Sequence, residues 1–227
     1  MEIIEGIHQV DGVNANTYVM IDGKELTVID TGMPENSEKI LNHIHKIGRQ
    51  SSGVSTILLT HYHMDHIGSA YELRKLTNAR VAVHEDDALF VAGTKAPPRP
   101  KNLVLRAFSF FIRSAPTQGF TPVQPDITLR GNDRIGRLVV IHTPGHTPGS
   151  ISLYEPESKV LFVGDAIMCI DGKIAPPPGQ FTQDMTKAIQ SIQKISKLDF
   201  RVMLSGHGEP LKPNASDKVK EFCSSMK

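Results

Sequence analysis

The feature that most constrains the fold of this chain is an order of predicted elements that occurs twice. In the first half the order is a β-hairpin at 18–30, a helical apolar stripe at 37–47 and a strand at 56–59. In the second half it is a hairpin at 151–163, a helical stripe at 185–195 and a strand at 200–204. Each hairpin leads to a carboxylate, Asp30 or Asp165, and each final strand leads to a histidine, His61 or His207. This internal repeat predicts two similar halves that face each other.

Two facing halves of this kind predict an α/β fold, a four-layer αβ/βα sandwich in which helices cover the outer faces of two packed sheets. The length of 227 residues suits one large domain, so we predict a single domain over 1–227. The segment 93–120 interrupts the pattern, and we expect it to be an insert. Within it, an apolar run at 103–112 could form a lid, a dimer contact or ordinary packing.

Composition limits the partners of the chain. Lys+Arg 25 and Asp+Glu 24 leave a formal charge of +1 without long runs of like charge, so we expect a small-molecule substrate and no nucleic acid. No stretch of 18 apolar residues or secretory leader is visible, so no membrane association is expected. The two cysteines, Cys169 and Cys223, form no CxxC motif. They favour a reducing compartment and a cytoplasmic protein, with a homodimer left open.

The stretch THYHMDHIG, residues 60–68, gathers metal-binding groups directly behind an apolar strand. Side chains two residues apart in an extended backbone project to the same side, so His61 and His63 can chelate one ion. Asp65 and His66 follow where the chain turns, and they can face a second ion. Zinc accepts both imidazole nitrogen and carboxylate oxygen, and a catalytic zinc keeps one position for water.

Five short motifs follow one another along most of the chain. They are the aspartate of VIDTG, H-x-H-x-D-H, the histidine of TPGHTPGS, the aspartate of FVGDA and the histidine of SGHG. In this order they resemble the metallo-β-lactamase superfamily of metallohydrolases. The resemblance implies two divalent ions, with zinc expected and iron or manganese as alternatives. The implied ligands are His61, His63 and His146 for one ion, Asp65, His66 and His207 for the other, and Asp165 between them.

The resemblance also implies the chemistry. Asp65 and Asp30 are the candidate catalytic residues, with Asp30 orienting the site without binding metal. We expect a hydroxide that bridges the two ions to attack an ester, lactone or thioester carbonyl. Common β-lactamases of the superfamily have arginine at the position of His66 and cysteine at that of Asp165. The chain therefore resembles more closely the stand-alone hydrolases, including glyoxalase II-like thioesterases and acyl-homoserine-lactone lactonases.

Other readings of the same motifs stay open. A mononuclear iron persulfide dioxygenase, a hydrolase of β-lactams or phosphodiesters, and a noncatalytic binding module could all use this scaffold. The remaining histidines match no ligand position, and we expect structural or solvated roles for His8, His43, His45, His84 and His142. Cys169 is expected to be a packed thiol. The proline-rich loop 175–179 and Phe181 are expected near the mouth of the metal cleft.

Overall fold

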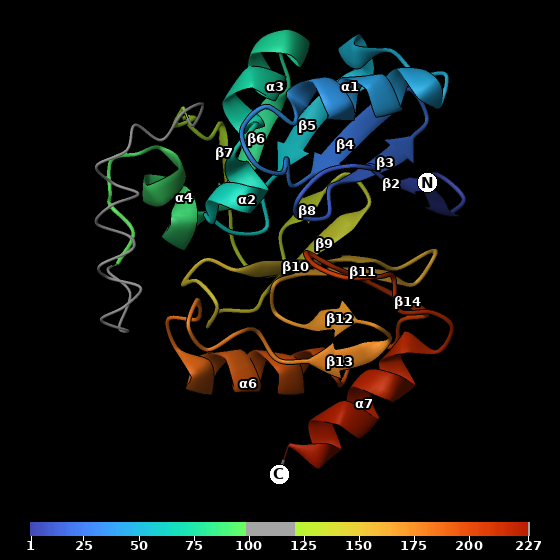
Figure 1. Cartoon of the computed structure of the whole chain (residues 1–227), viewed down its shortest axis with the longest axis vertical. Helices are drawn as coiled ribbons and strands as arrows, with labels where there is room; N and C mark the ends of the chain where they lie inside the picture. The colour runs from blue at the N-terminus through green and yellow to red at the C-terminus, as the bar shows by residue number, and fades with distance from the viewer. Residues whose placement is uncertain (99–120, 227) are drawn as a thin grey trace.

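The computed structural model describes residues 1–98 and 121–226, and these form two facing β-sheets (Figure 1). The first sheet has the order β1 (Glu2–Ile4), β2 (Ile7–Gln9), β3 (Tyr18–Asp22), β4 (Glu25–Ile29), β5 (Val54–Leu58), β6 (Arg80–His84), β7 (Ile127–Leu129). The second has the order β14 (Val202–Ser205), β11 (Val160–Gly164), β10 (Ile151–Glu155), β9 (Leu138–His142), β8 (Arg134–Ile135). A small hairpin joins β12 (Met168–Ile170) to β13 (Lys173–Ala175).

Helices cover the outer face of each sheet. The helices are α1 (Ser37–Lys46), α2 (Met64–Ile67), α3 (Ala70–Thr77), α4 (Glu85–Val91), α6 (Met185–Ile195) and α7 (Ala215–Ser225), with a 3-10 turn at Ser51–Gly53. In Figure 1, α1 and α3 lie above the first sheet, whereas α6 and α7 lie below the second. This helix, sheet, sheet, helix order confirms the predicted αβ/βα sandwich.

The internal repeat is visible in the strand pairing. β3 and β4 form an antiparallel hairpin, and β4 then pairs in parallel with β5 across the α1 crossover. β10 and β11 form the second hairpin, and β11 pairs in parallel with β14 across α6. The predicted helices agree closely with α1 and α6, whereas β5 starts two residues before the predicted strand and β14 two residues after it. The ends of these parallel strands carry the predicted ligands to one edge.

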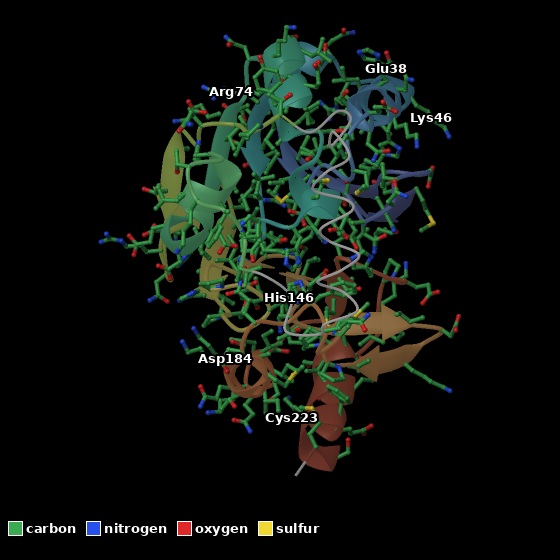
Figure 2. All side chains as sticks on the ribbon, turned by 60° about the vertical axis from the view of Figure 1, so that its left-hand side comes forward. Glu38, Lys46, Arg74, His146, Asp184 and Cys223 are labelled. Atoms are coloured by element: carbon green, nitrogen blue, oxygen red, sulfur yellow. The ribbon has the colours of Figure 1, made fainter. Side chains whose placement is uncertain are left out.

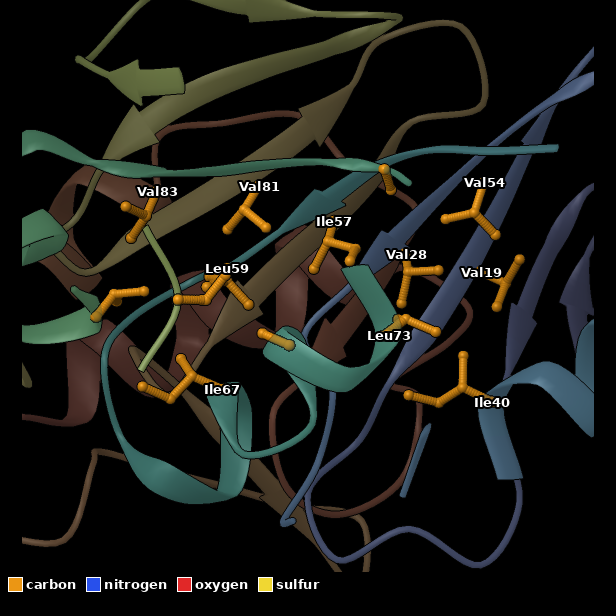
Figure 3. Close-up of a cluster of buried hydrophobic side chains, with 14 of the residues drawn as sticks. Val19, Val28, Ile40, Val54, Ile57, Leu59, Ile67, Leu73, Val81 and Val83 are labelled. Carbon is orange, nitrogen blue, oxygen red and sulfur yellow. The ribbon is translucent and has the colours of Figure 1, made fainter. Parts of the chain in front are cut away.

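Strands buried on both faces hold the layers together. In β5, Ile57 packs toward the helices that cover the first sheet (Figure 3). The adjacent Leu58 packs between the sheets. In β11, Leu161 packs toward the outer helices and Phe162 toward the first sheet. The Phe162 ring meets that of Tyr18 edge-on at 5.4 Å. Near-continuous apolar runs of this kind are expected for strands covered on both sides.

The predicted insert is described only in part. Residues 99–120, including the apolar run at 103–112, lie outside the described residues, so the alternatives of lid, dimer contact and packing stay predictions. In the described part of this insert, the Lys95 ammonium lies 4.6 Å from the centre of the Phe90 ring. Within the described ranges, no helix has the length and apolar character needed to cross a membrane.

Candidate metal centre

Loops at the ends of four strands bring the predicted ligands together between the two halves of the molecule. His61 follows β5, His146 follows β9, Asp165 follows β11 and His207 follows β14. The remaining three, His63, Asp65 and His66, lie on the short turn into and through α2. Figure 2 shows His146 at the level where the upper and lower halves meet.

Three histidines form the first triad, which we define as His61, His63 and His146. One ring nitrogen from each lies within 4.8 Å of the others. His63 Nδ1 and His146 Nε2 are 2.9 Å apart, and the His61 ring centre lies 4.8 Å from that of His63. His61 and His146 are almost fully buried, at 0% and 2% exposure.

The second triad consists of Asp65, His66 and His207. His207 Nε2 lies 3.1 Å from Asp65 Oδ2, and His66 Nε2 lies 3.6 Å from the same oxygen. Asp165 stands between the triads, because its Oδ2 is 3.4 Å from His146 Nε2 and 3.5 Å from His207 Nε2. The structure therefore brings all seven predicted side chains together in the predicted grouping, with Asp165 in contact with both groups.

Asp30 and Thr60 fix the two most buried imidazoles. His66 Nδ1 lies 2.8 Å from Asp30 Oδ2, and the Thr60 backbone N–H and hydroxyl both donate to the same carboxylate, at 2.8 and 2.7 Å. With its proton on Asp30, the Thr60 oxygen can accept the Nδ1–H of His61, 3.0 Å away. Asp30 adopts a left-handed backbone, with φ 57°, and its carboxylate contacts His66 directly and His61 through Thr60. This geometry is compatible with the orienting role expected for Asp30, which stays a prediction.

A second threonine fixes the orientation of His146. The Thr182 hydroxyl donates to the Pro178 carbonyl at 2.9 Å, so its oxygen can accept the Nδ1–H of His146, 3.3 Å away. Three imidazoles of the centre thus give their Nδ1–H to a defined oxygen, which leaves each Nε2 lone pair directed inward. Metal-binding histidines commonly show this arrangement.

Three buried atoms at the centre have no hydrogen-bond partner among the described residues. They are His61 Nε2, His66 Nε2 and Asp165 Oδ1, of which the last two lie 3.5 Å apart as an ion pair without a hydrogen bond. Unpartnered buried polar atoms are rare in folded proteins and indicate a missing ion or water. Five imidazoles and two carboxylates form a donor set for a borderline divalent ion such as zinc, with iron and manganese also compatible. The residues present therefore fit the metal that the sequence implies.

The two triads differ in their electrostatics. Burial, together with the neighbouring His66, lowers the pKa of His61 far below its usual value and that of His63 to about 4. Burial also opposes a charge on His66, but Asp165 and Asp30 outweigh it and raise the pKa of His66 to about 9. The hydrogen bond to Asp65 raises the pKa of His207. Without metal, the first triad is therefore neutral, whereas the second carries protons near neutral pH.

The triads line a cleft of about 430 Å³, which we call the metal cleft. Its walls include His63, Asp65 and His207, and Pro178 and Phe181 also line it, as predicted for that loop. A second cavity of about 760 Å³, the side pocket, shares His63, Met64 and Phe181 with the metal cleft. The two cavities are therefore neighbours.

The histidines without a predicted metal role lie elsewhere. His84 and His142 do come together with Asp86, but their rings stack at 4.0 Å with an 18° angle between planes. Lone pairs in the planes of stacked rings cannot point at one ion, and His142 Nε2 lies 2.9 Å from the Pro148 carbonyl oxygen. This geometry favours the structural role expected for both.

Cys169 is buried in the core beneath the second sheet, where burial raises the pKa of its thiol.

Sequence reasoning missed the residues that hold the ligands in place. Thr60 and Thr182 bond ligand imidazoles, and Asp87 bonds the loops that carry them. Thr60 had a local signal, because it is a polar residue at the buried end of an apolar strand. Thr182 and Asp87 had none, since their partners lie 36 and 60 residues away along the chain.

Comparison with known proteins identifies the family. The family model described as "Metallo-beta-lactamase superfamily" matches residues 10–207. The chain belongs to the metallo-β-lactamase superfamily. The match covers every predicted ligand, and it confirms the resemblance inferred from the five motifs.

Several known proteins are similar over most of the chain. Probable metallo-hydrolase YflN of Bacillus subtilis is 28% identical, over 92% of this chain and 86% of its own. Hydroxyacylglutathione hydrolase GloC of Haemophilus influenzae is 29% identical, over 82% of each chain. Among solved structures, the metallo-beta-lactamase family protein TTHA1429 of Thermus thermophilus has a TM-score of 0.76 at 24% identity, covering 99% of this chain and 80% of that one.

Proposed function

We propose that this chain is a binuclear metal-dependent hydrolase of small-molecule esters, lactones or thioesters. The observation that carries the proposal is the convergence of seven ligand side chains, three of whose buried atoms lack a hydrogen-bond partner, beside an open cleft. Among the described residues, no serine or cysteine lines the metal cleft. The related hydroxyacylglutathione hydrolase and probable metallo-hydrolase support a hydrolytic reaction.

The two triads would each hold one divalent ion, zinc being our expectation, and Asp165 would contact both. Bound there, the ions would supply an activated water at neutral pH and polarise the carbonyl oxygen of the substrate. The residues of the chain orient this chemistry. Asp30, Thr60 and Thr182 keep the Nδ1–H of three imidazoles turned away from the cleft. Asp65 lines the cleft, where its carboxylate would stand beside the scissile bond.

The side pocket supports a substrate with an apolar group. Its described walls include the stacked rings of Tyr62 and Phe90, Ile67 and the exposed Phe181. Lys95 lines the same cavity, and no carboxylate does so among the described residues. We therefore expect an apolar acyl or leaving group in the side pocket, with a neutral or anionic group tolerated near Lys95 and a cationic one disfavoured.

The proposal is tested by a hydrolysis panel on metal-reconstituted protein. Lactones, thioesters and simple esters of increasing chain length are compared with a phosphodiester and a β-lactam on one preparation. We expect the highest kcat/KM from one of the three substrate types with an acyl carbonyl, namely lactones, thioesters or simple esters. Within that type, kcat/KM should rise with the length of the apolar chain. A phosphodiester or β-lactam as best substrate would overturn the proposal, and oxygen consumption with a persulfide would identify a dioxygenase instead.

The proposal extends to the domain organisation, location, partners and oligomeric state of the protein. We propose a single domain, a cytoplasmic location, a small-molecule partner without nucleic acid or membrane, and a homodimer as the alternative to a monomer. Cys169 and Cys223 are both unpaired, which supports a reducing compartment. Light scattering of the purified protein would distinguish monomer from dimer.

A further inference from the structure

Helix α4 places a buried carboxylate between the two loops that carry the first triad. Asp87, in the first turn of α4, is 0% exposed and uses both carboxylate oxygens. Its Oδ2 accepts the backbone N–H of Tyr62 at 3.1 Å and the hydroxyl of Thr147 at 2.6 Å. Its Oδ1 accepts the backbone N–H of Gly149 at 2.7 Å. One side chain thus joins a loop after β5 to a loop after β9.

Two of the three residues that donate to Asp87 are next in sequence to the predicted ligands of the first triad. Tyr62 lies between His61 and His63, and Thr147 directly follows His146. The carboxylate therefore binds the backbone or side chain next to every member of the first triad. None of the three donor residues is next in sequence to a member of the second triad.

Two further contacts strengthen this junction. The Phe90 ring, one turn along α4 from Asp87, stacks on the Tyr62 ring at 4.4 Å. Helix α4 thus holds Tyr62 by both its backbone and its side chain. At the other loop, a Cβ on Gly149 would lie 2.6 Å from Asp87 N and 2.7 Å from Asp87 Oδ1. Only glycine allows this loop to approach the carboxylate so closely.

We propose that Asp87 is a positioning residue that sets the distance between the His61–His63 loop and the His146 loop, and thereby the metal affinity of the first triad. The inference rests on the proposed function in one respect, that the triad holds an ion. Without the carboxylate, the backbone N–H groups of Tyr62 and Gly149 would be left buried without their acceptor, and each such loss is unfavourable, whereas the Thr147 hydroxyl could still bond the Ser150 hydroxyl at 2.8 Å. The loops would separate until water reached these donors.

The experiment is a Co²⁺ titration of metal-free Asp87→Asn and of the unmodified protein. An amide can accept from some of these donors, but its NH₂ group faces the others. We expect the first-triad ion to bind roughly 10- to 100-fold more weakly, the range found when groups supporting a ligand are removed. We expect the second-triad ion to be unchanged. Imidazole N–H signals shifted by Co²⁺ separate the triads, since His61 and His146 belong to the first and His66 to the second.

Glu155→Gln is the matched control. Glu155 is also 0% exposed and accepts the backbone N–H groups of Glu157 and Ser158 and the Ser158 hydroxyl, in the β10–β11 turn. It resembles Asp87 in burial and in its backbone and hydroxyl donors, differs in facing Arg137 Nε at 3.7 Å, and touches neither triad. Its replacement should leave both Co²⁺ affinities unchanged.

A second variant and a second readout keep the proposal falsifiable if Asp87→Asn does not fold. Thr147→Val removes one donor while keeping the side-chain shape, and should weaken only the first-triad ion, by a smaller factor. In metal-free protein, amide exchange at Tyr62 and Gly149 should accelerate in Asp87→Asn. The inference would be overturned if both ions bound equally more weakly, or if neither affinity changed, with amide exchange unchanged in either case. Failure of the unmodified protein to bind Co²⁺ would overturn the proposed function, while faster amide exchange alone would still support the junction.

Discussion

The two triads of the metal centre are built differently although they share Asp165. The first contains imidazoles only, and two of its three members are almost fully buried. The second includes a carboxylate, and the side chains of Asp65 and His207 are 34% and 29% exposed. The loops of the first triad are joined by the buried Asp87, whereas the His207 loop is held through its backbone carbonyls. Asn16 Nδ2 donates to the carbonyls of residues 205 and 208.

This difference in burial and protonation predicts that the two triads bind metal differently. A neutral, buried triad is ready to bind an ion with little change in protonation. A partly exposed triad that carries protons must release them when it binds a metal, because ligating imidazoles are neutral. We therefore expect the first triad to be the fixed part of the centre and the second to be the part that adapts to substrate.

The largest expected effect is that of His61→Ala. Loss of this buried ligand would remove the ion that activates water. Binding to a single zinc lowers the pKa of water from about 15.7 to about 7, and this activation would be lost. We expect kcat/KM to fall by roughly 10³-fold or more, with metal content by mass spectrometry falling as well. Normal turnover in a metal-depleted variant would contradict the metal mechanism.

His207→Ala should have a smaller and more selective effect. The second triad keeps Asp65 and His66, so we expect its ion to bind more weakly by at least roughly 10- to 100-fold, the range seen even for supporting groups. The first-triad ion should be retained at full affinity. Isothermal titration of Zn²⁺ into the metal-free variant measures this, and simultaneous loss of both ions would show that the triads are not separable.

The supports of the two triads should also differ in pH dependence. Burial raises the pKa of Asp87 to about 6, above the ordinary value of 3.8, although its three hydrogen bonds act in the opposite direction. A raised folded-state pKa adds stability that is complete below pH 3.8 and is lost as pH rises through 6. The unmodified protein should therefore lose about 2 kcal/mol relative to Asp87→Asn between pH 4 and 6.

Chemical unfolding of both metal-free proteins across this pH range measures the difference. Asn16→Ala serves as the comparison for the second triad, since an amide does not titrate. Its stability relative to the unmodified protein should stay constant over the same interval. A constant difference for Asp87→Asn as well would show that the Asp87 carboxylate titrates as it does in the unfolded chain.

The smallest effect is expected for Tyr18→Phe. The buried Tyr18 hydroxyl donates to the Ser205 carbonyl at 2.7 Å, and the same oxygen also accepts from Asn16 at 2.9 Å. Because one donor remains, we expect a loss of about 1 kcal/mol in unfolding free energy. Zn²⁺ affinity should fall slightly at the second triad only. An equal effect at the first triad would mean that the His207 loop supports both.

The sequence predicted the ligands of both triads better than the residues that support them. His61, Asp165 and His207 each follow a strand, and the ends of parallel strands meet at one edge, so local pattern and topology predicted that they converge, while the resemblance to the superfamily implied their roles as ligands. Asp87 and Thr147 are 60 residues apart and meet only after α4 packs against the loop beyond β9. The hairpin β12–β13 was also missed, because it is short and its strands have no strong alternation.

The left-handed backbone of Asp30 is unfavourable by itself and is kept in place by the hydrogen bonds of its carboxylate. For a residue with a Cβ this conformation is disfavoured by roughly 1–2 kcal/mol, and glycine adopts it without that penalty. Asp30→Gly would relieve the backbone but remove the acceptor for His66 and Thr60. The two Thr60 donors and the His66 N–H would then be buried without an acceptor, which is more unfavourable than the backbone strain that glycine relieves, so selection for heat resistance should retain the aspartate.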